Sequence, residues 1–311
     1  MPRKEPTEVK EVWNSKIEQG DSNTHISYSQ LSTFTACPKK WQRKYIDKEA
    51  PFLSSIYTVF GTAFHETLQE WLTVLYKEKI KDAMEMDLEK LLYKNIVEEY
   101  QKQRESSNDS FSSPEELQLF YLDGIHILEY IKKHRAIYFS RKEVYLAGIE
   151  TLLYVKLQNN TYFKGFVDLV LYDKDLDMWE IVDIKTSTKG WNKWAKSDES
   201  KTAQILLYKH HFSEQFGIPI EKIKVNYFIV KRQIPIDPEF PAMARRVQQF
   251  APPSGKIKTG KALRSMKHFI EVAIDSEGNY LDKQHITTPS KHTCRFCEFS
   301  INKSCGDAIT K

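Results

Sequence analysis

Three charged residues interrupt two apolar segments near the middle of the sequence. Asp168 lies within GFVDLVLY, and Asp183 and Lys185 lie within MWEIVDIKT. Burying charges is costly unless they are paired or hold a partner, so these positions need an explanation. Side chains alternate between the two faces of a strand, so Asp183 and Lys185 share one face. A hairpin that turns at DKDLD places Asp168 opposite Val182, give or take one residue, and therefore next to Asp183.

A third carboxylate, that of Glu150, is expected near this pair. The same counting through the NN turn brings Glu150 close to Asp168, although a β-bulge must set the face that it uses. Converging carboxylates cannot all stay ionised without a cation, and their oxygens suit Mg²⁺ or Mn²⁺. Lys185 beside them can hold an attacking water and offset charge that develops on a phosphate. The alternative is an exposed hairpin in which Asp183 and Lys185 only pair with each other.

The elements that must position these residues follow from hydrophobic periodicity. Helical spacing is found from Gly61 through TAFHETLQEWLTVLYKEKI, over about 85–101 and 114–140, and over 201–216. Strand-like segments are LAGIETLLYVKL, TYFKGFVDLVLY, MWEIVDIKT and KVNYFIVK, and ALRSMKHFIEVAI is a further helix. The chain is therefore expected to fold as an α/β protein.

One domain is expected over residues 25–311, preceded by a polar N-terminal arm at 1–24. Within the domain, a helical insertion spans about 81–140 and the charged β-meander about 144–187. Hydrophobic residues make up 41% of the 311 residues, which is enough for a sizeable core. No apolar run is long enough to cross a bilayer and the N-terminus is not a signal peptide, so we expect a soluble cytoplasmic protein with no membrane partner. Its place could equally be the nucleoid or the cytoplasm of a phage-infected cell.

Four short motifs occur in an order that resembles the PD-(D/E)xK nuclease superfamily, and in particular its RecB-type branch. They are GxxxH at 61–65, GxxD at 165–168, DxKT at 183–186 and QxxxY at 204–208. Each motif alone is a weak match, whereas four in the family's order, over about residues 25–305, are a specific one. The resemblance implies a restriction-endonuclease-like fold, in which helices flank a mixed central sheet, with a helical insertion and a C-terminal Cys cluster.

The resemblance also implies roles for individual residues. The metal ligands that it implies are Asp168, Asp183, the carbonyl of Ile184, His65 and, at a position where many relatives carry an acidic residue, Glu150. Lys185 would act on the attacking water, and Gln204 and Tyr208, one helical turn apart, would line the site and contact the DNA backbone. Without the family, His65 would be interpreted as a hydrogen-bonded core histidine. Gln204 and Tyr208 would be ordinary half-buried helix residues.

The four cysteines form a second candidate centre. Cys294, Cys297 and Cys305 lie close together in the sequence, and Cys37 lies near the other end. A CxxC pair lets two thiolates reach one metal, and four thiolates complete a tetrahedral Zn²⁺ site or a [4Fe–4S] cluster. Disulfides are the alternative, but nothing marks the chain as secreted. Spacing alone leaves zinc and the cluster both open.

The sequence around Cys37, ISYSQLSTFTACPKKWQRKYI, resembles the N-terminal cysteine segment of iron–sulfur RecB-type nucleases, including AddB-type and CRISPR-adaptation exonucleases. In those relatives one early cysteine joins a C-terminal trio to hold [4Fe–4S]. The resemblance therefore implies that Cys37, Cys294, Cys297 and Cys305 hold such a cluster, with structural Zn²⁺ as the alternative. Seven residues separate Cys297 from Cys305, where relatives more often have about five. The centre is expected to join the two ends of the chain around the sheet.

Three weaker signals concern possible binding. Trp191 and Trp194, interleaved with lysines, could stack bases of a single strand and track its phosphates, or could pack into the domain. Residues 255–262, GKIKTGKA, nearly match a phosphate-binding P-loop but end in Ala rather than Ser or Thr, which predicts a basic loop and no ATP site. The pair His210-His211 is expected on a helix surface.

The function predicted from these features is that of a Mg²⁺- or Mn²⁺-dependent DNA nuclease. An exonuclease acting on DNA ends or single strands in recombination, repair or replication is favoured. A non-cleaving DNA-binding or scaffold module of a recombination or CRISPR-adaptation complex is one alternative, and a structure-directed endonuclease is another. The expected partner is DNA, and any unwinding of a duplex would need a helicase or recombination partner. The net charge of +4 supports a polyanionic partner only weakly.

Overall fold

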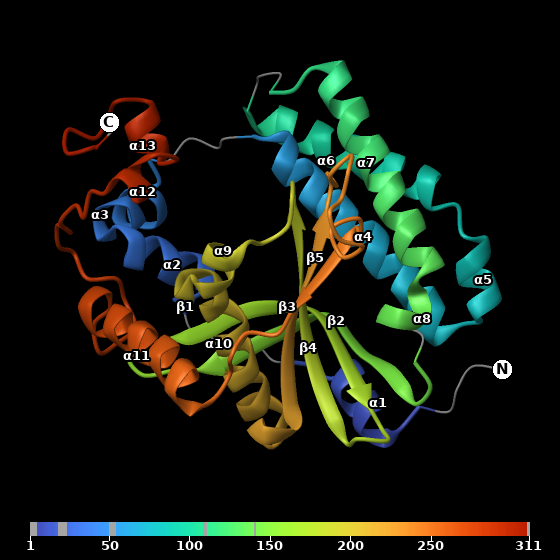
Figure 1. The fold of residues 1–311 in the computed structure, drawn as a ribbon. Helices are drawn as coiled ribbons and strands as arrows, with labels where there is room; N and C mark the ends of the chain where they lie inside the picture. The colour runs from blue at the N-terminus through green and yellow to red at the C-terminus, as the bar shows by residue number, and fades with distance from the viewer. Residues whose placement is uncertain (1–4, 18–23, 50–53, 108–110, 140, 310–311) are drawn as a thin grey trace.

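A mixed sheet lies between two layers of helices in the computed structural model (Figure 1). The structure describes residues 5–17, 24–49, 54–107, 111–139 and 141–309. The strands of this part are β1 (His25–Ile26), β2 (Val144–Lys156), β3 (Tyr162–Asp173), β4 (Met178–Ser187), β5 (Ile223–Lys231) and β6 (Val247–Phe250). The pairs β2–β3, β3–β4 and β5–β6 are antiparallel, whereas β1–β3 and β4–β5 are parallel. The α/β architecture predicted from the sequence, a mixed central sheet flanked by helices, is confirmed.

Strands β3 and β4 pair over only part of their length and then diverge. Their register runs from Asp173–Met178 to Leu169–Val182, one residue away from the counted pairing and within its allowance. At the other end of β3, the same edge is taken by the short strand β1, which pairs with residues 162 and 163. We call the region between these pairings, where β3 leaves β4, the fork. The charged residues of the meander lie at this fork.

Glu150 lies opposite Asp168, as the counting predicted, and the one register shift of β2 lies beyond it. The register of β2 against β3 shifts between Leu146 and Gly148, which is the geometry of a β-bulge. Glu150 itself has a φ of 45°, in the left-handed region that a glutamate rarely adopts. Glu150 lies across from Asp168, between the paired positions Ile149–Leu169 and Thr151–Val167, in a stretch whose register runs unbroken from the turn.

Long helices cover one face of the sheet and bury it in an apolar core with α4 at its centre. The helices of this layer are α4 (Ile56–Lys77), α5 (Ile80–Glu85), α6 (Leu88–Ser107), α7 (Pro114–Lys133) and α8 (Arg135–Tyr138). Helix α4 begins where the Ser55 hydroxyl accepts a hydrogen bond from the N–H of Tyr57. Helix α7 begins at Pro114, which directly follows the N-cap residue Ser113. Helices α5 to α8 occupy the stretch expected as a helical insertion, and the whole layer lies at the upper right in Figure 1.

The opposite face of the sheet packs against helices from both ends of the chain. They are α1 (Thr7–Trp13), α2 (Tyr28–Ala36), α3 (Pro38–Trp41), α9 (Lys193–Ser197), α10 (Glu199–Phe216) and α11 (Lys256–Ala273), and the C-terminal turns are α12 (Lys291–Cys294) and α13 (Glu298–Ile301). A π-helical turn (Gln42–Ile46) follows α3, and a 3₁₀ turn (Ile220–Lys222) precedes β5. Helix α10 ends at Gly217, whose φ of 64° is the left-handed conformation expected of a C-terminal glycine.

Several parts of the sequence interpretation need correction. The stretch expected as a polar arm contains α1, whose Val9 and Val12 are buried in the core beside β2. Two valines three residues apart suffice to fix a short helix, and they were too few to give a periodic signal. The strands β1 and β6 were not predicted, because each has four residues or fewer. Residues 256–262, expected as a loop, form the start of α11, where Lys258 and Lys261 pair with Glu199.

Within the described residues, no helix combines the length and apolarity needed to cross a membrane.

Candidate active site

Asp183 is an almost completely buried carboxylate on β4, 1% exposed. Its Oδ1 atom forms a 2.7 Å ion pair with Lys185 Nζ, and its Oδ2 atom has no hydrogen-bond partner among the described residues. Burial raises the pKa of Asp183 to about 6, against the opposing effect of Lys185. Burial alone would lower the pKa of Lys185, but Asp183 and Asp168 reverse this and raise it. Lys185 is therefore an ammonium group at neutral pH.

Asp168 lies on β3 at the fork. Its Oδ2 atom accepts a 2.7 Å hydrogen bond from the backbone N–H of Ile184 and lies 3.8 Å from Nδ1 of His65. Burial raises the pKa of Asp168 to about 6, opposed by Lys185 and by the Ile184 hydrogen bond. Asp168 also helps to raise the pKa of Asp183, so the two carboxylates are close enough to repel each other.

His65 reaches the two aspartates from α4. Burial lowers the pKa of His65, and the nearby Lys185 ammonium lowers it further. Asp183 and a hydrogen bond to the backbone of Ile184 act in the opposite direction without reversing the shift. The imidazole is therefore neutral at neutral pH, which is the form that can bind a metal.

A glutamine that the sequence interpretation missed links Glu150 to the fork. Gln69 is buried on α4, and its Nε2 atom donates a 2.6 Å hydrogen bond to Glu150 Oε1 and a 3.3 Å hydrogen bond to the backbone carbonyl of Asp168. Gln69 lies four residues after His65, so both side chains leave the same face of α4. That spacing was the available signal, but a glutamine in a helix is too common to stand out without the fold.

The side chains of Gln204 and Tyr208 continue the polar network from Lys185 onto α10. The Gln204 Oε1 atom accepts a 3.1 Å hydrogen bond from Lys185 Nζ, and its Nε2 atom donates a 3.0 Å hydrogen bond to the Tyr208 hydroxyl. Burial raises the pKa of Tyr208, so its hydroxyl stays protonated. The network that starts at Asp183 thus runs through Lys185 to α10.

The oxygen-rich donor set of the fork fits a hard divalent cation, although it is more open than a bound ion requires. Among the described residues, no three ligand atoms from Asp168, Asp183, Glu150 and His65 lie within 4.8 Å of one another. Mutual repulsion of the carboxylates and the Lys185 ammonium beside Asp183 account for the spread. Because Lys185 also donates to Gln204, it can leave Asp183 without losing its polar contact. A cation would then replace Lys185 as the positive charge beside the buried Asp183 carboxylate.

Comparison with known proteins connects this geometry to a family. The sequence profile of the PD-(D/E)XK nuclease superfamily matches residues 25–302. The chain belongs to this superfamily. Its fold is similar to a crystal structure from Eubacterium rectale described as a "Putative exonuclease", with a TM-score of 0.52 and 10% sequence identity over 95% of this chain and 96% of that chain. At that identity the likeness is one of fold alone. No match was found among curated proteins.

The hydrogen bond from Gln69 to Glu150 at the fork suggests that Gln69 positions the Glu150 carboxylate, and this role can be tested. We expect Gln69→Ala to weaken Mn²⁺ binding by about 10-fold, the usual cost of losing a hydrogen bond that orients a ligand, because Glu150 loses its donor. Isothermal titration of Mn²⁺ into the metal-free protein measures this. Thr73→Ala, one turn further along α4 with a hydroxyl that bonds to the Gln69 carbonyl, is the matched control. Equal Mn²⁺ affinity in Gln69→Ala and the parent would contradict the positioning role.

All four cysteines of the nuclease line one pocket of about 550 Å³ between the N-terminal helices and the C-terminal turns. Figure 1 shows α12 and α13 beside α3. A backbone hydrogen bond from Ile309 lowers the pKa of the Cys294 thiol, and hydrogen bonds from Ser290 and Thr293 lower it further. The thiolate form, which binds metals, is thereby favoured at Cys294. No three of the four sulfurs lie within 4.8 Å of one another.

Polar contacts hold the C-terminal turns against the helices that follow Cys37. Lys40 forms a 2.7 Å ion pair with Glu298, and the Arg43 guanidinium lies 3.9 Å above the Phe299 ring. Arg43 also donates hydrogen bonds to the backbone carbonyl and the hydroxyl of Ser304. The two ends of the chain are therefore docked at the cysteine pocket by their own side chains.

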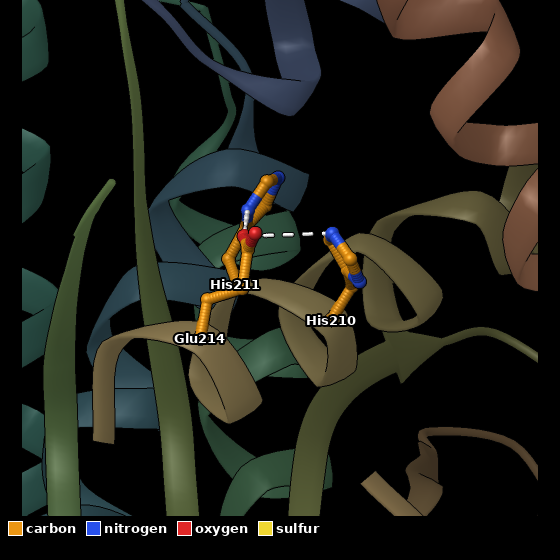
Figure 2. Close-up of side chains that lie close together, drawn as sticks. All are labelled: His210, His211 and Glu214. Atoms are coloured by element: carbon orange, nitrogen blue, oxygen red, sulfur yellow. Dashed lines mark hydrogen bonds and ion pairs between the residues drawn. The ribbon is translucent and has the colours of Figure 1, made fainter. Parts of the chain in front are cut away.

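A histidine pair further along α10 behaves differently from its predicted surface position. His211 is buried, at 1% exposure, and its ring stacks on Phe163 of β3 with centroids 4.3 Å apart. Its Nδ1 atom lies 3.0 Å from Glu214 Oε2, and His210 Nε2 lies 3.4 Å from the same oxygen (Figure 2). The prediction was wrong for His211, because the residue lies seven positions after Gln204, on the face of α10 that turns towards the sheet. Burial lowers the pKa of His211, so it is a neutral core residue.

Proposed function

We propose that this protein is a Mg²⁺- or Mn²⁺-dependent deoxyribonuclease of the RecB-type branch that degrades DNA from an end. The observation that carries the proposal is the pair of buried carboxylates, Asp183 and Asp168, beside the single ammonium of Lys185 at the strand fork. Two buried carboxylates beside one ammonium leave a surplus of negative charge, which a bound cation would neutralise. Membership of a nuclease superfamily makes a phosphodiester bond the expected substrate.

The residues that would hold the ion are Asp168, Asp183, the carbonyl of Ile184, His65 and Glu150. A bound divalent ion would supply Lewis-acid activation of water and neutralise charge on the phosphate. The Ile184 N–H orients Asp168 through its 2.7 Å hydrogen bond, and Gln69 orients Glu150. Both hydrogen bonds fix the direction of a carboxylate before any ion arrives, which lowers the cost of organising the site.

Lys185 would act as a hydrogen-bond donor rather than as a base. Its raised pKa keeps the side chain protonated at neutral pH, so it cannot accept a proton from water. The ammonium can instead hold the attacking water in place and stabilise negative charge on the phosphate oxygens. The Gln204 amide holds Lys185 on the α10 side, and the protonated Tyr208 hydroxyl holds Gln204. Gln204 and Tyr208 would also contact the DNA backbone.

We further propose that Cys37, Cys294, Cys297 and Cys305 hold a [4Fe–4S] cluster. Their common pocket supports one shared centre. The resemblance of the segment around Cys37 to that of iron–sulfur RecB-type nucleases favours the cluster over Zn²⁺. Its role would be to join the chain ends, and it would take no part in hydrolysis.

Digestion of three DNA substrates by anaerobically purified holoprotein tests the proposed activity. We expect end-labelled single strands or duplex ends to be degraded in the presence of Mn²⁺, and a covalently closed circle to survive. Cleavage of the circle would identify an endonuclease instead. Binding without cleavage of any substrate would identify a scaffold module.

The setting of this activity would be DNA metabolism in the cytoplasm, in recombination, repair or replication. A helicase or recombination protein would supply any unwinding of duplex DNA.

A further inference from the structure

Two neighbouring tryptophans that follow the catalytic strand have opposite environments. Trp191 packs on Tyr227 and Phe250, with ring centroids 4.8 Å and 6.2 Å away. Trp194, three residues later on α9, is 81% exposed. Exposing a whole indole ring to water forfeits the stabilisation that Trp191 obtains by packing. The contrast within one short segment indicates that the Trp194 ring has a partner outside the chain.

The segment that carries Trp194 is fixed close to the catalytic strands. Tyr227, on which Trp191 packs, is the β5 residue paired with Asp183. The backbone of Trp191 exchanges hydrogen bonds of 2.8 Å and 3.1 Å with the Gln248 side chain. The Asn192 side chain caps α9 by accepting a 2.9 Å hydrogen bond from the N–H of Ala195. Trp194 is therefore presented by a rigid turn anchored beside Asp183.

The charges around Trp194 suit a polyanion. The sequence KGWNKWAK carries three lysines, of which Lys189 and Lys193 are exposed. The two acidic residues that follow, Asp198 and Glu199, already have partners within the chain. Asp198 accepts hydrogen bonds from Ser200 at the start of α10, and Glu199 is paired with Lys258 and Lys261. The surface beside the indole ring is therefore positive.

A second exposed aromatic ring lies on the other strand of the fork. Phe166 is 44% exposed and precedes Asp168 by two residues on β3, in the part of the strand that β4 no longer pairs. Phe166 therefore offers an exposed aromatic ring on the same face of β3 as Asp168. A basic surface that offers aromatic rings is what single-stranded nucleic acid binds, because every unpaired base has a face that can stack.

We propose that Trp194 stacks on an unpaired base of the substrate, and that Lys189 and Lys193 bind the adjoining phosphates. The inference rests on the proposed nuclease function and deepens it by naming the substrate class. The strand that enters the fork is single-stranded where it passes α9. A duplex is then a substrate only where its end is frayed or has been unwound. Stacking at Trp194 holds the strand in register with the catalytic aspartates.

The experiment measures DNA binding without cleavage. In holoprotein carrying Asp183→Asn to prevent hydrolysis, fluorescence anisotropy gives the affinity for a labelled 15-nucleotide dT strand and for a blunt hairpin duplex of equal length. We expect Trp194→Ala to weaken binding of the dT strand by about 10-fold and binding of the duplex by less than about 2-fold. Trp194→Phe, which keeps a ring, should restore most of the affinity. Tyr93→Ala, at an exposed aromatic residue of α6, should change neither affinity.

The outcomes separate this inference from the proposed function. Unchanged dT binding in Trp194→Ala overturns the stacking inference and leaves the nuclease proposal standing. Equal weakening for both substrates also overturns it, because a contact to phosphates alone would not distinguish them. A parent protein that binds neither DNA, together with a wild type that cleaves none, contradicts both.

Discussion

Replacement of Asp183 by asparagine is expected to reduce DNA cleavage by roughly 10³-fold or more while leaving the fold and DNA binding intact. Asparagine keeps the shape of the side chain but removes the charge that would hold the divalent ion. The DNA-binding groups proposed here lie on other residues, so binding should persist. Single-turnover cleavage of an end-labelled strand in Mn²⁺ measures the effect. Asp175→Asn, at an exposed carboxylate in the turn of the same hairpin, should cleave at the wild-type rate.

The same substitution should stabilise the metal-free protein. The pKa of Asp183 is raised in the folded state to about 6 from 3.8. The folded state therefore binds a proton more strongly than the unfolded state, and ionisation of Asp183 costs stability as the pH rises from about 4 to about 6. Above pH 6 the full cost is present. Asparagine avoids it, so we expect the Tm at pH 7.5 to rise by on the order of 5 °C.

The pH dependence and the response to metal check this explanation. The gain in Tm should shrink as the pH falls towards 4, where Asp183 is protonated in both proteins. Adding Mn²⁺ should raise the Tm of the wild type and much less that of Asp183→Asn. Lys185 makes the expected gain in Tm smaller, because its charge already offsets part of the cost of burying the Asp183 carboxylate. A variant that cleaves at the wild-type rate, or that melts below the wild type at pH 7.5, would show that Asp183 is a structural carboxylate.

The fork explains why charged residues interrupt apolar strands in this chain. Where β3 leaves β4, the backbone N–H of Ile184 is released from the β3–β4 ladder and donates to the Asp168 carboxylate instead. Strands β3 and β4 keep their apolar pattern up to the fork. The buried carboxylates lie where the two strands separate, so they do not interrupt the β3–β4 pairing.

The sequence predicted this arrangement because it depends on local rules. Alternation along β4 places Asp183 and Lys185 on one face, and counting through a short hairpin places Asp168 within one residue of its observed pairing. The same counting through the NN turn places Glu150 opposite Asp168, as observed. The order of the motifs then gave the superfamily, since four spacings must all match.

Contacts between segments distant in sequence could not be predicted in the same way. Gln69 reaches Glu150 across the interface between α4 and β2, and a sequence gives no measure of how a helix is placed on a sheet. The burial of His211 depends on Phe163 of another strand in the same manner. Strand β1 forms because two residues meet the free edge of β3, so its existence depends on the completed sheet. Each case requires tertiary packing to be known first.

Replacement of Cys297 by alanine is expected to remove a visible absorption band near about 400 nm from anaerobically purified protein, and to lower its Tm by at least about 10 °C. Cys297 lines the pocket shared by all four cysteines, so its loss should release the whole centre. Absorption spectra, iron and zinc analysis, and melting curves recorded on the same sample measure the two effects together. Ser300→Ala, in the wall of the same pocket, should leave the absorption band and the Tm unchanged.

The size of the stability effect follows from chain entropy. Cys37 and Cys294 lie roughly 250 residues apart, and a cross-link that closes a loop of 100 residues already contributes about 5 kcal/mol by limiting the unfolded chain. The Lys40–Glu298 ion pair and the Arg43 contacts remain in the variant, but partly exposed ion pairs are worth at most about 1 kcal/mol each. These contacts are too weak to replace the stabilisation that the proposed four-cysteine centre would give by joining the two ends of the chain. Zinc in place of iron would keep the loss of Tm but give a colourless parent. An unchanged Tm in a metal-free variant would show that side-chain contacts alone hold the C-terminal turns in place.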